Sequence, residues 1–352
     1  MKIFCRFFLF PTRSWLIVIL LGCLSGCDWL APVDFRGDRR FTAQNLGVII
    51  NEKDPLSVQV GEYYQQKRGI PNKNMIRVSF PPTKNQISVE KFQQIQAQVD
   101  QQLSGNIQGF ALTWAAPFRV KCMSITSAFA LGYDPVYCAQ GCQPTAPNAY
   151  FQNPSHRPYR DFQVRPTMMI AGKNFAEAKA LIDRGVNADG THPQGTAYLL
   201  ITKDKARNVR SVTFGETKAA LGSQFKVEII EGNVLANRQD VMFYFTGLPK
   251  VEKLETLQFR PGAIADHLTS FGGVLNGKGQ MSSLRWLEAG ATGSYGTVEE
   301  PCNFPQKFPH VPSLMKAYLS GATLLESYWQ SVFWPGQGIF IGEPLARPFG
   351  QS

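Results

Sequence analysis

The amino-acid sequence predicts an α/β fold, with mainly parallel sheets flanked by helices and divided between two α/β subdomains. Short, wholly apolar segments such as residues 46–50 and 241–245 have the composition of strands that are buried on both faces. Segments with apolar residues at helical spacing stand between many of these strands. Strands separated by single helices favour parallel pairing with right-handed crossovers.

Residues 43–132 form the predicted N-terminal α/β subdomain. Its first helix is expected to begin after Asp54, which suits an N-cap, and to end before Gly69. A second helix begins after Ser88 and carries an apolar stripe at spacings of three and four. The predicted strands are 46–50, 76–80 and 110–114.

Residues 133–166 have no clear period and contain six prolines and a cysteine pair. So long an irregular stretch is typically functional or poorly ordered, and this Pro-rich loop is expected to separate the subdomains. Residues 167–352 alternate again and form the predicted C-terminal α/β subdomain. Its strands are predicted at 167–170, 197–201, 227–230, 241–245, 263–268, 292–298 and 339–342. Its helices are predicted at 174–183, around 284–287, at 314–319 and at 324–329.

Residues 1–26 are predicted to be a lipoprotein signal peptide. The first residues of the chain are positively charged and include no acidic residue. They precede an apolar run at 15–21, which is shorter than the roughly 20 residues of a membrane span. The run ends at Leu24-Ser25-Gly26-Cys27, which resembles the bacterial lipobox. The basic residues that precede the apolar run are Lys2, Arg6 and Arg13.

The lipobox predicts that the thiol of Cys27 takes a diacylglycerol and anchors the chain to membrane lipid. Cys23 is a poorer candidate because the bulky Leu21 stands where a small residue is preferred, and an uncleaved signal anchor is the alternative. Residues 27–42 then form a tether. In enterobacteria, Asp after the lipidated Cys retains a lipoprotein at the inner membrane, so Asp28 suggests the periplasmic face of that membrane.

Composition is that of an exported domain with a basic surface. Removal of residues 1–26 leaves 326 of the 352 residues and lowers the formal charge of +10 by three, to +7. A chain of this length suits one large domain or two smaller ones. A basic domain at a membrane could touch anionic lipid or an acidic polymer, although a generally basic soluble surface is the simpler interpretation. No phosphate-loop or nucleic-acid motif occurs, so no cofactor and no nucleic-acid partner is predicted.

Four cysteines follow the lipidation site: Cys122, Cys138, Cys142 and Cys302. An even count in an oxidising compartment predicts two disulfides, with three possible connectivities. We favour Cys138–Cys142, which closes a small loop, and Cys122–Cys302, which ties the early part of the chain to the late part. A zinc site is the alternative, although the chain lacks the Cys-x-x-Cys pairs that such sites usually show.

Segments near both ends of the mature chain carry a family resemblance. They are 51–58 (NEKDPLSV), 63–64 (YY), 68–71 (RGIP), 260–263 (RPGA), 296–301 (GTVEEP) and 342–349 (GEPLARPF). Together they resemble a bacterial lipoprotein family of uncharacterised function, found in genomes that carry exosortase, a membrane transpeptidase-like sorting enzyme. The resemblance spans most of residues 45–350 and implies a cell-envelope context rather than an activity.

A more distant resemblance is to the gingipain-type cysteine peptidases, which have a caspase-like fold. Those chains run strand, Gly-His-Gly, strand, catalytic Cys, helix, strand, and later Gly-Asp-Pro. Here Tyr244–Gly247 ends the first strand, Asp266–Phe271 ends the second, and Gly342-Glu343-Pro344 stands near the end. The resemblance implies a caspase-like C-terminal subdomain. Leu248-Pro249 replaces the His and Thr269-Ser270 replaces the Cys, so the catalytic dyad of that family is not matched.

Candidate catalytic residues nevertheless follow the predicted strands, where α/β sheets present ligand crevices. His267 with Ser270 or Thr269 is a possible base and nucleophile, against a structural histidine. Asp266 cannot complete a local relay, because neighbours in a strand point to opposite faces.

Glu300, next to Glu299, is a candidate acid, base or metal ligand, against a surface or salt-bridged pair. The remaining histidines are expected to be exposed, since they stand in loops that contain Pro or Gly. They are His156, His192 and His310.

The sequence therefore favours a non-catalytic envelope lipoprotein that binds a protein or glycan partner through a peptidase-like domain. Two alternatives remain open. One is a hydrolase that uses Ser270 or Thr269 with His267, or Glu300 with water. The other is a basic domain that holds an anionic polymer.

Overall fold

The computed structural model describes residues 40–351, except residues 83, 84 and 140. Its strands are β1 (Leu46–Asn51), β2 (Met75–Val78), β3 (Gln86–Ile87), β4 (Gly109–Leu112), β5 (Arg119–Val120), β6 (Met123–Ser124), β7 (Thr167–Met169), β8 (Thr196–Ile201), β9 (Lys226–Glu231), β10 (Arg238–Thr246), β11 (Leu257–His267), β12 (Gly293–Thr297) and β13 (Gly338–Gly342). Its α-helices are α1 (Pro55–Arg68), α2 (Val89–Asp100), α3 (Ile125–Leu131), α4 (Pro158–Phe162), α5 (Phe175–Ala188), α6 (Phe214–Leu221), α7 (Leu284–Glu288), α8 (Val311–Leu319) and α9 (Leu324–Trp329).

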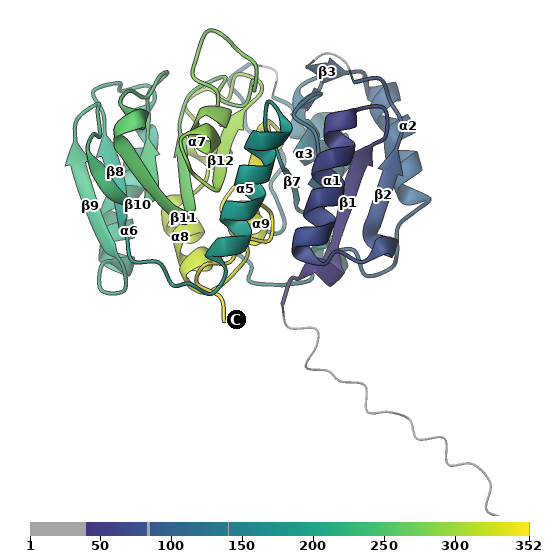
Figure 1. Cartoon of the computed structure of the whole chain (residues 1–352). Coiled ribbons are helices and arrows are strands. Elements are labelled where there is room, and N and C mark those ends of the chain that lie inside the picture. The colour runs from purple at the N-terminus through teal and green to yellow at the C-terminus, as the bar shows by residue number, and fades with distance from the viewer. Residues whose placement is uncertain (1–39, 83–84, 140, 352) are drawn as a thin grey trace, which may run out of the picture. The chain divides into compact units, whose positions relative to one another are not determined.

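Ten strands form one sheet that both halves of the chain share (Figure 1). Its order is β2-β1-β4-β7-β13-β12-β11-β10-β8-β9, and the short strands β3, β5 and β6 form a second sheet. Helices α1, α5 and α7 cover one face of the large sheet, while α2, α3, α6, α8 and α9 cover the other (Figure 1). The predicted α/β class, a mainly parallel sheet flanked by helices, is confirmed.

The sheet consists of two parallel groups joined by β13. Strands β2, β1, β4 and β7 are parallel, as are β9, β8, β10, β11 and β12. Strand β13 is antiparallel to β12 and lies next to β7, where Ile341 pairs with Met169. The loops that follow β2 and β11 meet at one edge, the upper one in Figure 1, where the side chains of Asn85 and Asn276 are hydrogen-bonded.

Local signals fix most element ends. The Asp54 carboxylate accepts a hydrogen bond from the backbone N–H of Leu56 at 3.0 Å, and Gly69 ends α1 in the left-handed conformation with φ +61°. Every strand predicted from the sequence is present, and the bounds agree within three residues except for β11, which begins six residues before the predicted start at 263. The sequence missed α3, α4, α6 and the small sheet, because these elements are short and lack a clear period.

The Pro-rich segment 133–166 is irregular, apart from α4 and the 3₁₀ turn Pro135–Tyr137. It is nevertheless packed against the end of the chain. The buried Asn148 side chain donates to the backbone carbonyl oxygens of Trp329 and Val332, at 2.8 and 3.2 Å. These hydrogen bonds hold a long loop in place without a regular element.

A buried ion pair ties α1 to the end of β13. Glu343 is fully buried and accepts from the Tyr64 hydroxyl at 2.6 Å and from Arg68 Nε at 3.0 Å. Arg68 also pairs with Asp189. Glu343 belongs to the Gly-Glu-Pro segment, and its carboxylate is fully engaged in holding the two halves of the sheet together.

The predicted signal peptide, the lipidation site Cys27, Asp28 and the tether up to residue 39 lie outside the described residues. In the part of the chain that the structure describes, no helix is long and apolar enough to cross a membrane.

Candidate functional site

The carboxyl ends of β10 and β11 form the centre of the predicted site. The two strands are parallel neighbours, and their register pairs Thr246 with His267 where both strands end. The loops that follow them are in contact, since the N–H of Met281 donates to the carbonyl oxygen of Pro249 at 2.8 Å. The strand arrangement expected from the gingipain resemblance is therefore present.

His267 is buried, with 1% of its surface exposed. Trp286 Nε1 donates to its Nδ1 at 2.9 Å, because an indole N–H can only donate. The proton of the imidazole therefore lies on Nε2, which donates to the carbonyl oxygen of Met281 at 3.0 Å. Burial lowers the pKa of His267 to about 4. His267 is thus a neutral imidazole with both nitrogens occupied.

The expected pairing of His267 with Ser270 or Thr269 is not formed, because Met281 and Trp286 hold both imidazole nitrogens. Thr269 is buried, and its hydroxyl donates to Gln280 Oε1 at 2.8 Å and accepts from Arg207 Nε at 3.1 Å. Ser270 is partly buried, and no side chain among the described residues is hydrogen-bonded to its hydroxyl. Neither hydroxyl has the adjacent base that would make it a nucleophile.

Asp266 points to the other face of β11, as the strand geometry predicts. It forms a buried ion pair with Arg210, whose Nη1 lies 2.6 Å from Asp266 Oδ1. Arg210 Nη2 also donates to the carbonyl oxygen of Thr246 at 3.2 Å, and its guanidinium lies 5.3 Å from the centre of the Phe245 ring. Burial raises the pKa of Asp266, and Arg210 opposes that shift. The pair thus links the carboxyl ends of β10 and β11 on the face of β11 opposite to His267.

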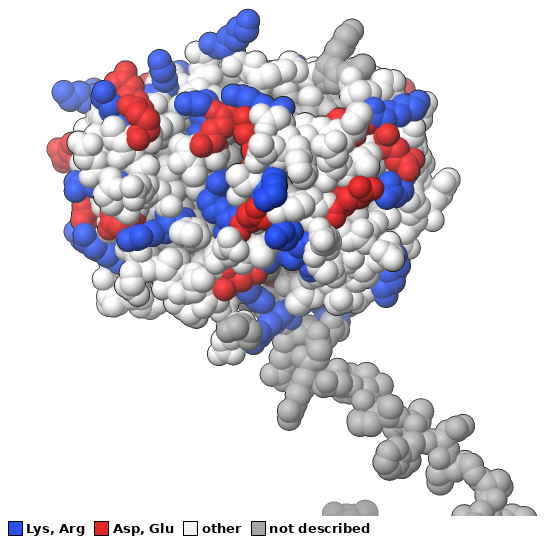
Figure 2. All heavy atoms as spheres, viewed as in Figure 1, with Lys and Arg blue, Asp and Glu red and all other residues white. Residues whose placement is uncertain are grey.

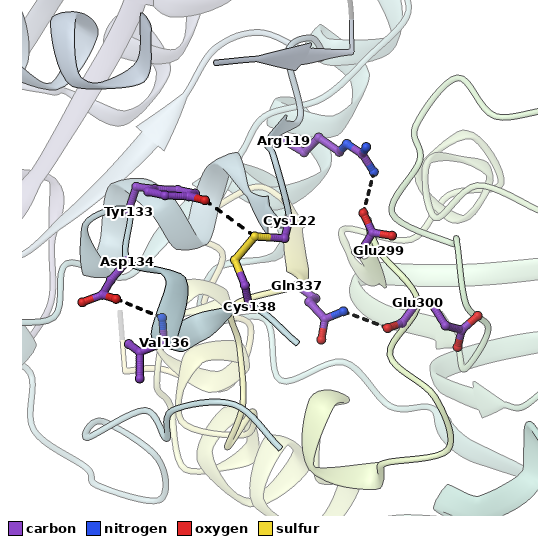
Figure 3. The surroundings of a disulfide bond; sticks show 9 residues. All are labelled: Arg119, Cys122, Tyr133, Asp134, Val136, Cys138, Glu299, Glu300 and Gln337. Carbon is purple, nitrogen blue, oxygen red and sulfur yellow. Dashed lines mark hydrogen bonds and ion pairs between the residues drawn. A yellow bond between two sulfur atoms is a disulfide. The ribbon is translucent and has the colours of Figure 1, made fainter. Parts of the chain in front are cut away.

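Glu299 and Glu300 follow β12 and make contacts typical of structural residues (Figure 3). Glu299 accepts from Arg119 Nη1 at 3.1 Å, which links the segment after β12 to β5 of the small sheet. Glu300 is exposed, and its carboxylate accepts from the backbone N–H of Cys302 at 2.7 Å. Its carbonyl oxygen accepts from Gln337 Nε2 at 2.8 Å. Among the described residues, no group of three or more His, Cys, Asp and Glu is placed to bind a metal.

The prediction of two disulfides is confirmed, but the favoured connectivity is wrong. Cys122 is bonded to Cys138 (Figure 3), with Cα atoms 5.6 Å apart. Cys142 is bonded to Cys302, with Cα atoms 5.5 Å apart. Closeness in sequence suggested Cys138–Cys142, whereas the fold lays this segment between the β5–β6 turn and the segment after β12, and each supplies one partner. All four thiols are consumed, so the zinc alternative is wrong as well.

A cavity of about 910 Å³ opens beside the loops that follow β10 and β11. Met281 lines it, whereas His267 does not. Lys and Arg side chains lie along this upper edge in Figure 2. The charged lining residues are Lys173, Lys250, Lys253, Lys278, Arg285, Glu252, Glu255 and Glu288. The five cations and three carboxylates give the lining a formal charge of +2, and Lys173 and Arg285 both pair with Glu288.

Three histidines gather at a second cavity that the sequence did not predict. Full exposure was expected for all three, and this is wrong for two of them. The partly buried His156 has Nδ1 2.5 Å from Glu326 Oε1, and the partly buried His310 has Nδ1 2.8 Å from Ser313 Oγ. His192 is exposed, as expected, and lines the same cavity. The loops that carry the three residues are distant in sequence, so no local spacing could reveal the cluster.

No protein-family model and no curated protein matches the chain. Among solved structures, the chain is similar to the complex of the pro- and mature domains of RgpB from Porphyromonas gingivalis. The comparison has a TM-score of 0.47 and 9% sequence identity, and it covers 86% of this chain and 79% of that chain. A similarity at this level assigns no activity to the chain.

Proposed function

We propose that this chain is an exported, lipid-anchored protein whose peptidase-like α/β domain binds a partner without hydrolysing it. The observation that carries the proposal is the state of His267. A general base must have a nitrogen within reach of the proton that it removes. Both nitrogens of His267 are bound within the fold, and the ring is 1% exposed.

The proposed location depends on the leader sequence. Residues 1–26 serve as the signal peptide, Cys27 carries the lipid, and residues 27–42 serve as the tether. Asp28 then favours the periplasmic face of the inner membrane. The family resemblance adds the exosortase sorting system as the context in which the protein works.

The proposed partner is an acidic segment of another envelope protein, with an anionic glycan as the second candidate. It is expected to bind in the crevice beside the loops after β10 and β11. The 910 Å³ volume and the excess of Lys and Arg in the lining favour an anionic ligand of more than one residue. Lys250 and Lys278 lie in the two loops that form the crevice walls.

The catalytic question is tested with the full chain and a panel of fluorogenic peptides and esters. We expect no turnover above that of the buffer. Turnover that disappears in Ser270→Ala, but persists in Ser320→Ala at the opposite edge, would establish the hydrolase alternative instead. Loss of turnover in Glu300→Gln alone would point to the mechanism with an activated water.

The partner is tested in cells by placing a photo-crosslinking amino acid at position 278. We expect a crosslink that is lost when Lys250→Glu is added and retained with the control Lys218→Glu, which lies on α6. Peptides of a second protein in the digested adduct, identified by mass spectrometry, establish a protein partner, whereas a loss of mass on treatment with glycosidase establishes a glycan. A crosslink that is indifferent to Lys250→Glu would contradict binding in the crevice.

The anchor is tested by growing cells with an alkyne-labelled palmitate. We expect Cys27→Ala to abolish the label, while the control Cys23→Ala retains it. Label that persists in Cys27→Ala rules out lipidation at that cysteine.

A further inference from the structure

A cavity of about 1030 Å³ lies at the edge of the fold opposite to the crevice. It is lined by both ends of the described chain, where Arg40 Nη2 donates to Gln351 Oε1 at 3.2 Å. The C-terminus is at the lower edge in Figure 1, whereas the loop after β11 is at the upper edge. The cavity therefore shares no residue with the crevice assigned to partner binding.

The polar lining of this cavity is rich in nitrogen. Besides the three imidazoles of His156, His192 and His310, it contains three permanent cations and one carboxylate. They are Arg40, Lys316, Arg347 and Glu216. The formal charge of these side chains is therefore +2 with neutral imidazoles.

Two of the imidazoles are held in place by the fold. The fully buried Glu326 accepts from the backbone N–H of Thr323 at 2.8 Å, and its other oxygen holds His156 Nδ1 at 2.5 Å. His310 Nδ1 is hydrogen-bonded to Ser313, whose hydroxyl also accepts from Gln152 Nε2 at 2.8 Å. Both rings are thus oriented through Nδ1, and no hydrogen bond from a described residue occupies either Nε2. Groups oriented in advance lose little entropy on binding.

One cation is fixed in the same way. Arg347 Nε donates to the carbonyl oxygen of Gly321 at 2.6 Å, so that its guanidinium is held at the cavity wall. The other two cations, Arg40 and Lys316, are exposed. Apolar side chains complete the lining; they are Leu221, Leu319 and Phe349. A ligand with a charged head and an apolar or ring-shaped body fits such a lining.

We propose that this cavity binds a phosphate ester through Arg347, Lys316 and Nε2 of His310, while Nε2 of His156, whose Nδ1–H donates to Glu326, accepts from a hydroxyl group of the ester. A phosphomonoester carries a charge of about −1.5 to −2 and three strong acceptor oxygens, which suits a lining of charge +2 with several donors. A carboxylate has two acceptor oxygens and one charge, so it would leave more of these donors unsatisfied. The large volume leaves room for an organic group on the ester.

Two sources could supply this ligand. One is a water-soluble phosphate ester, and the other is the head group of an anionic lipid. The lipid source rests on the proposed anchor at Cys27.

The test uses the full chain, purified in detergent, and titration calorimetry with three probes. They are glycerol 1-phosphate, a short-chain phosphatidic acid and a short-chain phosphatidylcholine. We expect the two phosphomonoesters, glycerol 1-phosphate and phosphatidic acid, to bind. Lys316→Gln is expected to weaken that binding about tenfold. The control Lys53→Gln removes the same charge from an exposed side chain that follows β1 and lines neither cavity, and it is expected to leave the affinity unchanged. His310→Gln provides a second variant, with an expected loss of similar size.

The two sources give different results. Equal affinity for glycerol 1-phosphate and phosphatidic acid indicates a soluble ester, whereas much tighter binding of phosphatidic acid indicates a lipid. Absence of binding by both glycerol 1-phosphate and phosphatidic acid overturns the proposal, and so does binding that Lys53→Gln weakens as much as Lys316→Gln. If the chain without other substitutions gives no crosslink from position 278 but still binds phosphate, only the proposal of a partner-binding crevice is refuted.

Discussion

At the carboxyl ends of β10 and β11, His267 is enclosed between Trp286 and Met281, whereas at the opposite edge His156 and His310 border an open cavity. All three imidazoles are oriented by a hydrogen bond to the fold. The difference lies in the second nitrogen: that of His267 donates to a backbone carbonyl oxygen, whereas no described residue is hydrogen-bonded to that of His156 or His310. A histidine at the end of a strand in an α/β sheet is therefore a candidate base only if one nitrogen remains accessible.

The largest effect is expected from the buried ion pair beneath the crevice. Replacement of Arg210 by Met leaves the carboxylate of Asp266 buried without its partner. We expect the free energy of unfolding in urea to fall by about 3–5 kcal/mol. The double variant Arg210→Met with Asp266→Leu is the control, and it should recover much of that loss. If the single variant costs no more than the double one, the pair does not stabilise this edge.

His267→Ala is expected to cost somewhat less. It removes a buried ring and leaves the N–H of Trp286 and the carbonyl oxygen of Met281 without partners. We expect a loss of about 2–4 kcal/mol in unfolding experiments, with unchanged binding at the opposite cavity. If His267→Ala is fully stable but has lost an activity, His267 is a catalytic residue and not a structural one.

The pH dependence follows from the low pKa of His267. Its value is about 4 in the folded chain, against roughly 6.5 when unfolded. Between these values the unfolded chain takes up a proton that the folded chain does not, so stability falls as the pH drops from about 6.5 towards 4. Above about pH 6.5, His267 makes its full contribution to the free energy of unfolding, and below the folded pKa at most about 3 kcal/mol of that free energy is lost.

The measurement compares urea unfolding at about pH 7 and about pH 4.5 for wild type and His267→Asn. The asparagine side chain does not titrate, while all other groups titrate equally in both proteins. Wild type should therefore lose more stability than the variant. Equal losses would show that His267 titrates with an ordinary pKa and is accessible to water.

The fold was largely predictable from the sequence, whereas the sites were not. Apolar runs such as 241–245 and caps such as Asp54 act locally, so they define strands and helix ends correctly. Disulfide pairing, the enclosure of His267 and the gathering of three histidines depend on segments far apart in the chain. His156 and Glu326, for example, are 170 residues apart and meet only because the irregular segment 133–166 packs against α9.

The smallest effects on stability are expected at the histidine-lined cavity. His310→Gln removes one hydrogen bond, to Ser313, from a partly exposed ring, and we expect a cost of about 0.5–1 kcal/mol in urea unfolding. His192→Gln changes an exposed side chain and should alter stability by less than about 0.5 kcal/mol. If either substitution costs as much as His267→Ala, that ring supports the fold and not a ligand. A small cost in stability together with weakened binding of glycerol 1-phosphate is the result that distinguishes the two edges.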